Sequence, residues 1–453
     1  LRAAPPAPRA PEATALIAEA RLGGATGLAV ADAASGRLVE TLGHDTPLPP
    51  ASTAKAITAL YALDRLGPGF RFATRLIATG PVQGGVIAGD LVLAGTGDPT
   101  LDTDALAQMA QALAAQGVRG VQGRFLLHAG GVPRLDRIAT DQPDHVGYNP
   151  AISGLNLNFN RVHFEWRRGD KGYALAMDAR SERVVPPVGM ARMAVVDRDL
   201  PVYTYRGGNG TDDWTVARSA LGGGGARWLP VRQPEAYAGD VFRTLARARG
   251  LDLPPPRLTP TLPAGRVLVD RPSAPLPDLL RDMLKHSTNL TAEVLGLSAS
   301  GAGGLPASGR AMGDWARARY GRAGRFVDHS GLGADSRVTA ADLVAALTGA
   351  QGGPLPGLLK PFALRDAQGR ELRGHPVRVH AKTGTLNFVS ALAGYAVARS
   401  GRVLAFAVIS ADPARRAALP PEAQEAPPGG RDWARRARLL QSRLIERWTT
   451  VHA

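Results

Sequence analysis

The sequence predicts an α/β protein of the α+β kind, in which an antiparallel sheet is covered by helices and further domains, mainly β or mixed, are inserted. Three observations lead to this prediction. Strand-like segments occur near both ends of the chain, apolar residues at helical spacing follow them, and a long stretch with short strand-like runs lies between. At 453 residues the chain also exceeds what one hydrophobic core usually supports.

The first elements are a hairpin and a helix. Residues 27–30 and 37–41 are predicted strands, joined by the turn 33–36. After a proline-rich segment, apolar residues recur at helical spacing. This spacing predicts a helix that begins near Ser52 and has one apolar face, formed by Ile57, Leu60, Tyr61 and Leu63.

The last elements are three strands and a helix. Residues 377–385 form a strand whose alternation places Lys382 and Gly384 on one side. Strands 389–397 and 402–410 follow, so we expect 377–385 at the edge of an antiparallel sheet. An apolar stripe then predicts a helix that covers this sheet, formed by Trp433, Ala437, Leu440, Leu444 and Trp448.

Composition excludes several classes of protein. The net charge of +15 comes from scattered arginines, and aromatic residues make up 5%, so we expect no nucleic-acid partner. The charge favours peripheral association with an anionic envelope surface. No apolar run is long enough for a membrane span. Cysteine is absent and the nine histidines lack metal-ligand spacing, so we expect no metal and no other cofactor.

Lysine is scarce in this chain, with five lysines among 54 basic residues. An ammonium can lose its proton near neutral pH, whereas a guanidinium cannot. Lys55 follows Ser52 by three positions at a predicted helix start, so the amine and the hydroxyl share a face, beside the free amides of the first turn. Taken alone, a serine N-cap with a solvated lysine is the more frequent explanation.

Two further motifs change this interpretation. Residues 287–289 (STN) follow a helical stretch that begins near Pro277, and residues 382–385 (KTGT) end the predicted edge strand. Each is a weak signal alone, typical of a loop or a strand end. In the order S-x-x-K, S-x-N, K-T-G, the three motifs together indicate a serine acyl-transfer enzyme.

The chain resembles the penicillin-binding and serine beta-lactamase superfamily, and within it the D-alanyl-D-alanine carboxypeptidase/endopeptidase family typified by penicillin-binding protein 4. The three motifs occur in the family's order, and smaller matches surround them. Residues 95–101 (GTGDPTL) match G-x-G-D-P-T-L, residues 289–293 (NLTAE) also match, and His329 begins a segment, HSGL, where the family has D-G-S-G-L. The resemblance implies a beta-lactamase/transpeptidase-like catalytic domain.

The spacing of the motifs predicts the domain organisation. Ser52 and Ser287 are 235 positions apart. Compact beta-lactamases of the superfamily that the chain resembles keep these two motifs much closer, so the resemblance implies a large region inserted between them. The resemblance implies a second domain inserted in the first and a small third domain inserted in the second. We expect a catalytic domain from 1–75 and 265–453, a second domain from 76–164 and 228–264, and a third from 165–227.

The resemblance also implies the roles of the reacting groups. Ser52 attacks the carbonyl of a D-alanyl-D-alanine peptide, Lys55 accepts its proton, and the backbone amides of Ser52 and Thr385 hold the oxyanion. Ser287 relays a proton towards the leaving amine. Asn289 binds the substrate amide.

The K-T-G strand is expected to bind the other end of the substrate. Lys382, Thr383 and Thr385 attract the terminal carboxylate, and Gly384 lets the substrate backbone approach closely. Peptidoglycan peptides are the implied substrates and beta-lactam antibiotics the implied covalent inhibitors. The location is expected to be periplasmic or extracytoplasmic, with a signal peptide already removed.

Two departures from the family bear on stem-peptide specificity. The family usually has aspartate where His329 stands, and it has an arginine soon after the S-G-L triplet, where this chain has Gly333 and Ala334. Asp144 and Tyr148 are the candidate counterparts of the family's inserted-domain contact with the stem-peptide side chain. His329 itself is expected to be structural.

Two alternatives use the same fold. A beta-lactam or ester hydrolase would share the three motifs, and rapid turnover of penicillin would identify it. A non-catalytic envelope-binding module would form no covalent adduct with penicillin.

Overall fold

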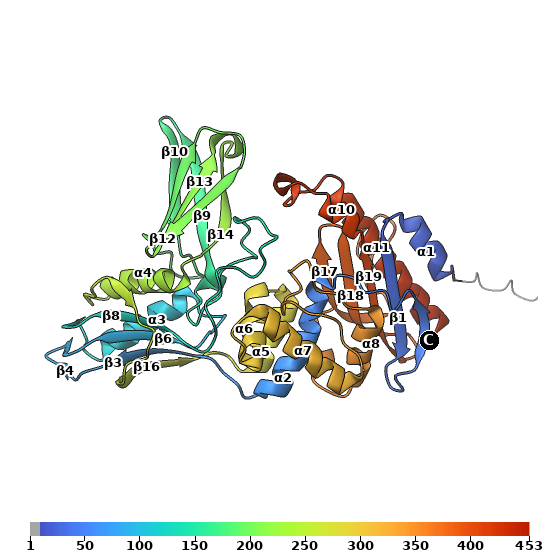
Figure 1. The fold of residues 1–453 in the computed structure, drawn as a ribbon, viewed down its shortest axis with the longest axis horizontal. Coiled ribbons are helices and arrows are strands. Elements are labelled where there is room, and N and C mark those ends of the chain that lie inside the picture. Colours follow the sequence, from blue (N-terminus) through green and yellow to red (C-terminus); the bar gives the residue numbers. More distant parts are fainter. Residues whose placement is uncertain (1–9, 453) are drawn as a thin grey trace, which may run out of the picture. The chain divides into compact units, whose positions relative to one another are not determined.

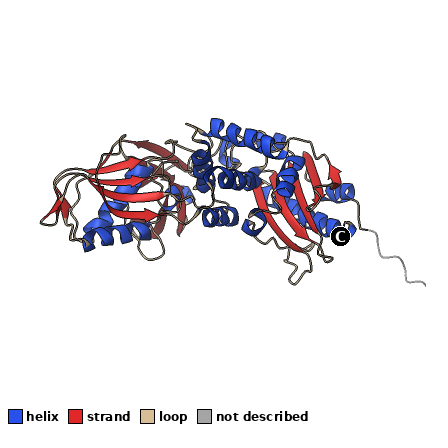
Figure 2. Cartoon of the chain, turned by 90° about the horizontal axis from the view of Figure 1, so that it is seen from below, coloured by secondary structure: helices blue, strands red, loops and turns tan. Residues whose placement is uncertain are grey.

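The computed structural model describes residues 10–452 and contains helices and antiparallel sheets, as predicted (Figures 1 and 2). The described chain divides into two compact units. The first comprises residues 10–61, 280–287 and 309–452, and the second comprises residues 62–279 and 288–308. These bounds differ from those of the predicted domains. The three-domain division stays a prediction.

The first unit contains a five-stranded sheet in the order β17-β18-β19-β1-β2. All neighbouring strands in it are antiparallel, and β17 lies at one edge, as predicted. The strands nearest the two chain ends therefore meet in the middle of this sheet, where Leu28 of β1 pairs with Val408 of β19. The bounds of the strands are β1 Ala25–Asp32, β2 Leu38–Leu42, β17 Arg378–Leu386, β18 Val389–Val397 and β19 Val403–Ala411.

Helices cover both faces of this sheet (Figure 1). On one face lies α11 (Gly430–Val451), whose predicted apolar stripe is fully buried with side chains of β1, β18 and β19, and α1 (Ala13–Ala20) packs beside it. On the other face lies α8 (Ala340–Gly349), where the Tyr395 hydroxyl of β18 donates to the Leu347 carbonyl. The covering helix predicted from the sequence is confirmed.

Further helices belong to one unit or cross the boundary between the units in the sequence. They are η1 Ala51–Thr53, α2 Ala54–Leu66, α5 Leu276–His286, α6 Asn289–Ser300, α7 Leu305–Tyr320, α9 Leu355–Leu358, α10 Pro413–Ala417 and η4 Pro421–Ala423. Helix α2 confirms the helix predicted near Ser52. None of the helices in residues 10–452 is both long and apolar enough to cross a membrane.

The second unit is built around a five-stranded sheet in the order β15-β8-β6-β3-β16, against which α3 (Thr103–Ala115) and α4 (Pro234–Arg247) pack. Its core buries Leu93, Phe125 and Phe242. The strands are β3 Ala73–Ala78, β6 Leu91–Gly95, β8 Phe125–Ala129, β15 Pro256–Leu258 and β16 Arg266–Pro272.

Three smaller sheets complete the second unit. Their orders are β4-β5-β7, β10-β9-β14 and β11-β13-β12, and the last two account for most of residues 161–230. The bounds are β4 Val82–Gln83, β5 Val86–Ile87, β7 Gly120–Val121, β9 Arg161–Gly169, β10 Gly172–Asp178, β11 Ala191–Val196, β12 Tyr203–Gly208, β13 Thr211–Ala217 and β14 Gly224–Pro230, with the short helices η2 Asn158–Asn160 and η3 Arg218–Ala220.

The contact between α11 and the sheet gives a prediction about stability. Trp433 is fully buried, its ring meets Phe388 edge-on at 6.1 Å, and its Nε1 donates to the Leu22 carbonyl. Trp433→Ala should lower the free energy of unfolding of the first unit by about 3–5 kcal/mol, the range typical of large core truncations. Denaturant unfolding measures this change. Arg438→Ala, at an exposed position of the same helix, is the control, and equal effects of the two variants would contradict the packing described.

Candidate active site

Ser52 lies in the 3-10 turn η1, directly before helix α2. The turn is tight: Ala51 has a φ of 46°, and the Thr53 hydroxyl donates to the Pro50 carbonyl at 2.6 Å. Gly331 packs against it so closely that a Cβ there would lie 1.9 Å from the Ala51 carbonyl oxygen. The serine is therefore held on a turn that neighbouring backbone supports.

Lys55 lies in the first turn of α2 and is fully buried. Its Nζ donates to the Ser52 Oγ at 2.8 Å and to the Ser330 carbonyl at 2.9 Å. The spacing of three residues thus brings the amine onto the hydroxyl, as the sequence predicts. Hydrogen bonding of this buried amine is required because an unsatisfied polar group would cost several kcal/mol.

The loop that follows residue 327 corrects the sequence analysis. The family's D-G-S-G-L motif corresponds to residues 328–332 (DHSGL), so its aspartate is Asp328 and His329 stands in place of glycine. Asp328 is buried and accepts the amides of Gly331 at 2.9 Å and Gly333 at 2.6 Å. Burial raises the pKa of its carboxyl, while these amides and Lys55 oppose the rise. Aligning all five letters of the motif would have identified Asp328.

His329 has a structural environment. It is fully buried, its ring is parallel to that of Tyr61 at 6.3 Å, and its Nδ1 lies 3.3 Å from the Met312 sulfur. Its carbonyl accepts the Thr58 hydroxyl at 2.6 Å. Burial lowers the pKa of His329 to about 3, so the ring is neutral at physiological pH.

Lys382 on β17 is the second buried lysine. Its Nζ donates to the Ser287 Oγ at 2.9 Å and to the Thr383 carbonyl at 2.7 Å. Burial holds the pKa of Lys382 well below its usual range, and the charges of Lys55 and Lys360 lower it further. Ser287, which follows α5, has a φ of 59° and turns the chain towards this lysine.

Gly384 explains how β17 comes close to the serine turn. A Cβ at this position would lie 2.9 Å from the Pro50 carbonyl oxygen and 3.0 Å from the Ser52 amide nitrogen. A side chain there would separate β17 from Ser52. The structure therefore brings together Ser52, Lys55, Ser287 and Lys382 in the first unit.

The other predicted site residues lie in the second unit or on β17, an edge strand of the sheet in the first unit. Asn289 is the first residue of α6, and its Nδ2 donates to the Tyr148 carbonyl at 2.9 Å. Tyr148 is 46% exposed, and its hydroxyl donates to Gln142 at 3.2 Å. Asp144 pairs with Arg137 at 2.6 Å.

Thr383 is half-buried on β17, and Thr385 is exposed.

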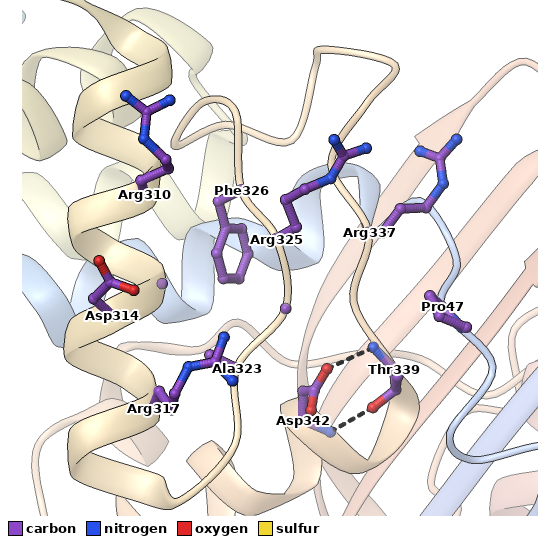
Figure 3. Close-up of a pocket in the computed structure, with 12 residues that line it drawn as sticks. Pro47, Arg310, Asp314, Arg317, Ala323, Arg325, Phe326, Arg337, Thr339 and Asp342 are labelled. Carbon is purple, nitrogen blue, oxygen red and sulfur yellow. Dashed lines mark hydrogen bonds between the residues drawn. The ribbon is translucent and has the colours of Figure 1, made fainter.

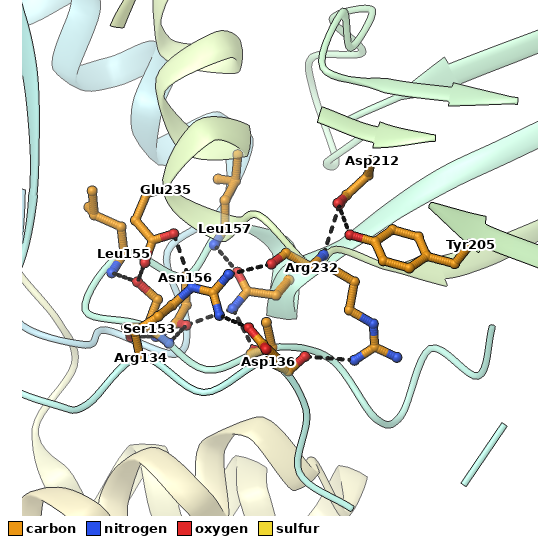
Figure 4. Close-up of polar contacts among 12 residues, drawn as sticks. Arg134, Asp136, Ser153, Leu155, Asn156, Leu157, Tyr205, Asp212, Arg232 and Glu235 are labelled. Carbon is orange, nitrogen blue, oxygen red and sulfur yellow. Dashed lines mark hydrogen bonds and ion pairs between the residues drawn. The ribbon is translucent and has the colours of Figure 1, made fainter. Parts of the chain in front are cut away.

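A buried arginine, Arg232, contacts the loop that carries Asp144 and Tyr148, and Figure 4 shows its contact with Asp136. Arg232 is 3% exposed. Its two terminal nitrogens donate to the carbonyls of Asp136 at 2.9 Å, Asn149 at 2.7 Å and Asp144 at 2.8 Å. Burial lowers the pKa of Arg232 to about 10. The sequence analysis did not identify Arg232, because one arginine among many scattered ones gives no signal.

A separate cavity of about 460 Å³ in the first unit contains none of these site residues (Figure 3). Four arginines and two aspartates line it, among them Arg310 and Arg317 on α7. The Asp342 carboxylate is already engaged, because it accepts the amide of Thr339, the N-cap residue of α8. This cavity is therefore distinct from the serine and lysine centre.

The sheet and the serine and lysine centre define a penicillin-binding type of fold. The chain superimposes on penicillin-binding protein 4 (DacB) from Haemophilus influenzae with a TM-score of 0.73 at 21% identity, covering 88% of this chain and 93% of that one. A predatory endopeptidase from Bdellovibrio bacteriovorus matches with a TM-score of 0.53 at 17% identity, over 93% and 92% of the chains.

Sequence comparison gives the family. The chain belongs to the D-Ala-D-Ala carboxypeptidase 3 (S13) family, whose profile matches residues 12–426. It is 31% identical over 435 residues to a D-alanyl-D-alanine carboxypeptidase from Actinomadura, covering 86% of this chain and 78% of the relative. A carboxypeptidase from Mycobacterium tuberculosis is 30% identical over 404 residues, covering 84% and 75%. The predicted resemblance and the classification as an enzyme are confirmed.

The environment of His329 predicts a pH dependence of stability. The folded-state pKa of about 3 lies below the unfolded value of about 6.5, so between them the unfolded chain binds a proton that the folded chain does not. The free energy of unfolding should therefore decrease as the pH drops below about 6.5. Protonation of His329 in the unfolded chain accounts for a loss of up to about 1.4 kcal/mol per pH unit.

The variant His329→Asn removes this titration and keeps an N–H group near Met312. Its unfolding free energy should fall less steeply than that of the wild type between pH 6.5 and 4, whatever its stability at neutral pH. Denaturant unfolding at several pH values measures both slopes. Parallel slopes would contradict a buried neutral histidine.

Proposed function

We propose that this chain is a serine-type D-alanyl-D-alanine carboxypeptidase/endopeptidase. It acts on peptidoglycan stem peptides and cross-links through an acyl-enzyme and is acylated by penicillins. One observation carries the proposal: the Nζ of the buried Lys55 lies 2.8 Å from the Ser52 Oγ. An amine in this position can accept the hydroxyl proton as the oxygen attacks a carbonyl carbon. The family and its named relatives support the substrate class.

In the acylation step, Ser52 forms a bond to the carbonyl carbon of the penultimate D-alanine, and its proton passes to Lys55. The Ser52 and Thr385 amides stabilise the oxyanion. The proximity of β17 to the Ser52 amide at Gly384 supports this pairing of donors. The C–N bond then breaks, and Ser287, which accepts a hydrogen bond from Lys382, relays a proton to the departing amine. Water releases the acyl group.

Substrate binding involves side chains beyond the reacting groups. The terminal carboxylate binds to Lys382, Thr383 and Thr385, whose side chains can donate hydrogen bonds to an anion. Asn289 binds the substrate amide. Tyr148, exposed beside the Asn289 amide, is the candidate contact for the stem-peptide side chain, and Asp144 is the candidate for its polar end.

We also propose that the protein is extracytoplasmic, because peptidoglycan, its proposed substrate, lies outside the cytoplasm. Peripheral association with the anionic envelope surface is part of this proposal, supported by the net charge of +15.

The first test of this function is covalent labelling. Benzylpenicillin should add one adduct mass to the wild type and none to Ser52→Ala, because a strained lactam mimics the peptide bond and its tethered leaving group hinders water. Intact-mass spectrometry measures both, and peptide mapping places the adduct. Stoichiometric labelling of Ser52→Ala would refute the nucleophile. Rapid loss of the adduct would indicate a beta-lactam hydrolase.

The second test concerns the base. Lys55→Arg keeps the charge but removes an amine that can lose its proton, so the acylation rate constant should fall by about a hundredfold or more. Acylation of the wild type should rise with pH as the amine is deprotonated. The acylation rate constant is measured by stopped flow at several pH values for both proteins. Thermal unfolding confirms that the variant is folded. A folded arginine variant that acylates at nearly the wild-type rate would show that Lys55 is not the base.

A further inference from the structure

A short segment of the first unit occupies part of the outer edge of β17. The Ala381 amide donates to the Lys360 carbonyl at 3.0 Å, and the Phe362 amide donates to the Val379 carbonyl at 2.8 Å. Pro361 and His380 form an antiparallel bridge between them. Residues 360–362 therefore run antiparallel to β17, and Lys360 is the member of this segment nearest to the K-T-G residues.

In the part of the chain that the structure describes, no other strand pairs with the rest of this edge. Backbone groups alternate in direction along a strand, so the outward amide of Ala381 places the amides of Thr383 and Thr385 on the same outer edge. A substrate with its scissile carbonyl near Thr385 and its carboxylate near Thr383 would run antiparallel to β17. It would lie in line with residues 360–362, and its carboxyl end would face Lys360.

The side chain of Lys360 is held near the centre. Its Nζ donates to the Lys285 carbonyl at 3.3 Å, in the last turn of α5. Two residues further on, the Ser287 Oγ accepts the hydrogen bond of Lys382. An ammonium has three donors, and the Lys285 carbonyl takes one of them. The charge of Lys360 also lowers the pKa of Lys382, as expected of neighbouring cations.

We propose that Lys360 is a specificity-determining residue, which binds the terminal carboxylate of the substrate beside Lys382 and Thr383; this inference rests on the proposed function. The ammonium of Lys360 lies where the substrate strand ends, at the C-terminal turn of α5. Its charge selects substrates that end in a free carboxylate over those in which that group is blocked.

A purely structural role predicts a different result. A cation at the end of α5 also stabilises the helix through its carbonyl groups. Loss of that contact would change acylation by every ligand to the same extent, whereas loss of a carboxylate contact would affect only ligands that carry the charge.

The test compares benzylpenicillin with its methyl ester, which differ in the carboxylate alone. The second-order acylation rate constant of each is measured by intact-mass spectrometry for the wild type, Lys360→Gln, Lys360→Arg and Lys171→Gln. Lys171 lies in the turn between β9 and β10, so Lys171→Gln removes the same charge elsewhere and serves as the control.

The wild type should prefer the acid. Lys360→Gln should reduce this preference by about tenfold, the size of a lost hydrogen bond to a charged group, by slowing the acid alone. Lys360→Arg should retain most of the preference and Lys171→Gln all of it. An equal change of both rate constants in Lys360→Gln, or no change in either, would overturn the inference. A wild type that neither ligand acylates would contradict the proposed function instead.

Discussion

The hydrogen bond between the buried Lys55 amine and the Ser52 hydroxyl is the interaction on which the rest of the first unit depends. An amine is costly to bury, so the surrounding chain must supply acceptors and exclude gaps. The Ser330 carbonyl supplies one acceptor, and the loop that carries it is folded around the Asp328 carboxylate. Gly331 and Gly384 let two separate backbone segments approach the serine turn from different parts of the sequence.

The buried lysines also affect the electrostatics of the site. Lys55 and Lys382 are both buried in the first unit, and burial together with the charge of Lys55 lowers the pKa of Lys382. Lys55 also interacts electrostatically with the buried Asp328 carboxyl, where its charge opposes the rise in pKa that burial causes. A substrate carboxylate bound beside Lys382 would favour the protonated form of this amine. Carboxylate binding and the protonation of the site are therefore coupled.

Much of the first unit could be predicted from the sequence, because its elements carry strong local signals. The stripe from Trp433 to Trp448 has helical period, the strand that ends in KTGT alternates, and a serine and lysine three apart must share a helix face. Other features depend on contacts between distant segments. No local pattern shows that Arg232 holds three carbonyls of one loop, or that residues 360–362 pair with β17. Asp328 could also have been identified from the sequence. The family motif was aligned one position too late, so that its aspartate was placed at His329.

The central claim is that the reaction passes through an acyl group on the enzyme. Two peptides with the same acyl part, one ending in D-alanine and one in D-lactate, can be cleaved with hydroxylamine present at a fixed concentration. A common acyl-enzyme would partition between water and hydroxylamine after the leaving group has departed. The account predicts the same ratio of hydroxamate to free acid from both peptides. A ratio that changes with the leaving group would contradict it.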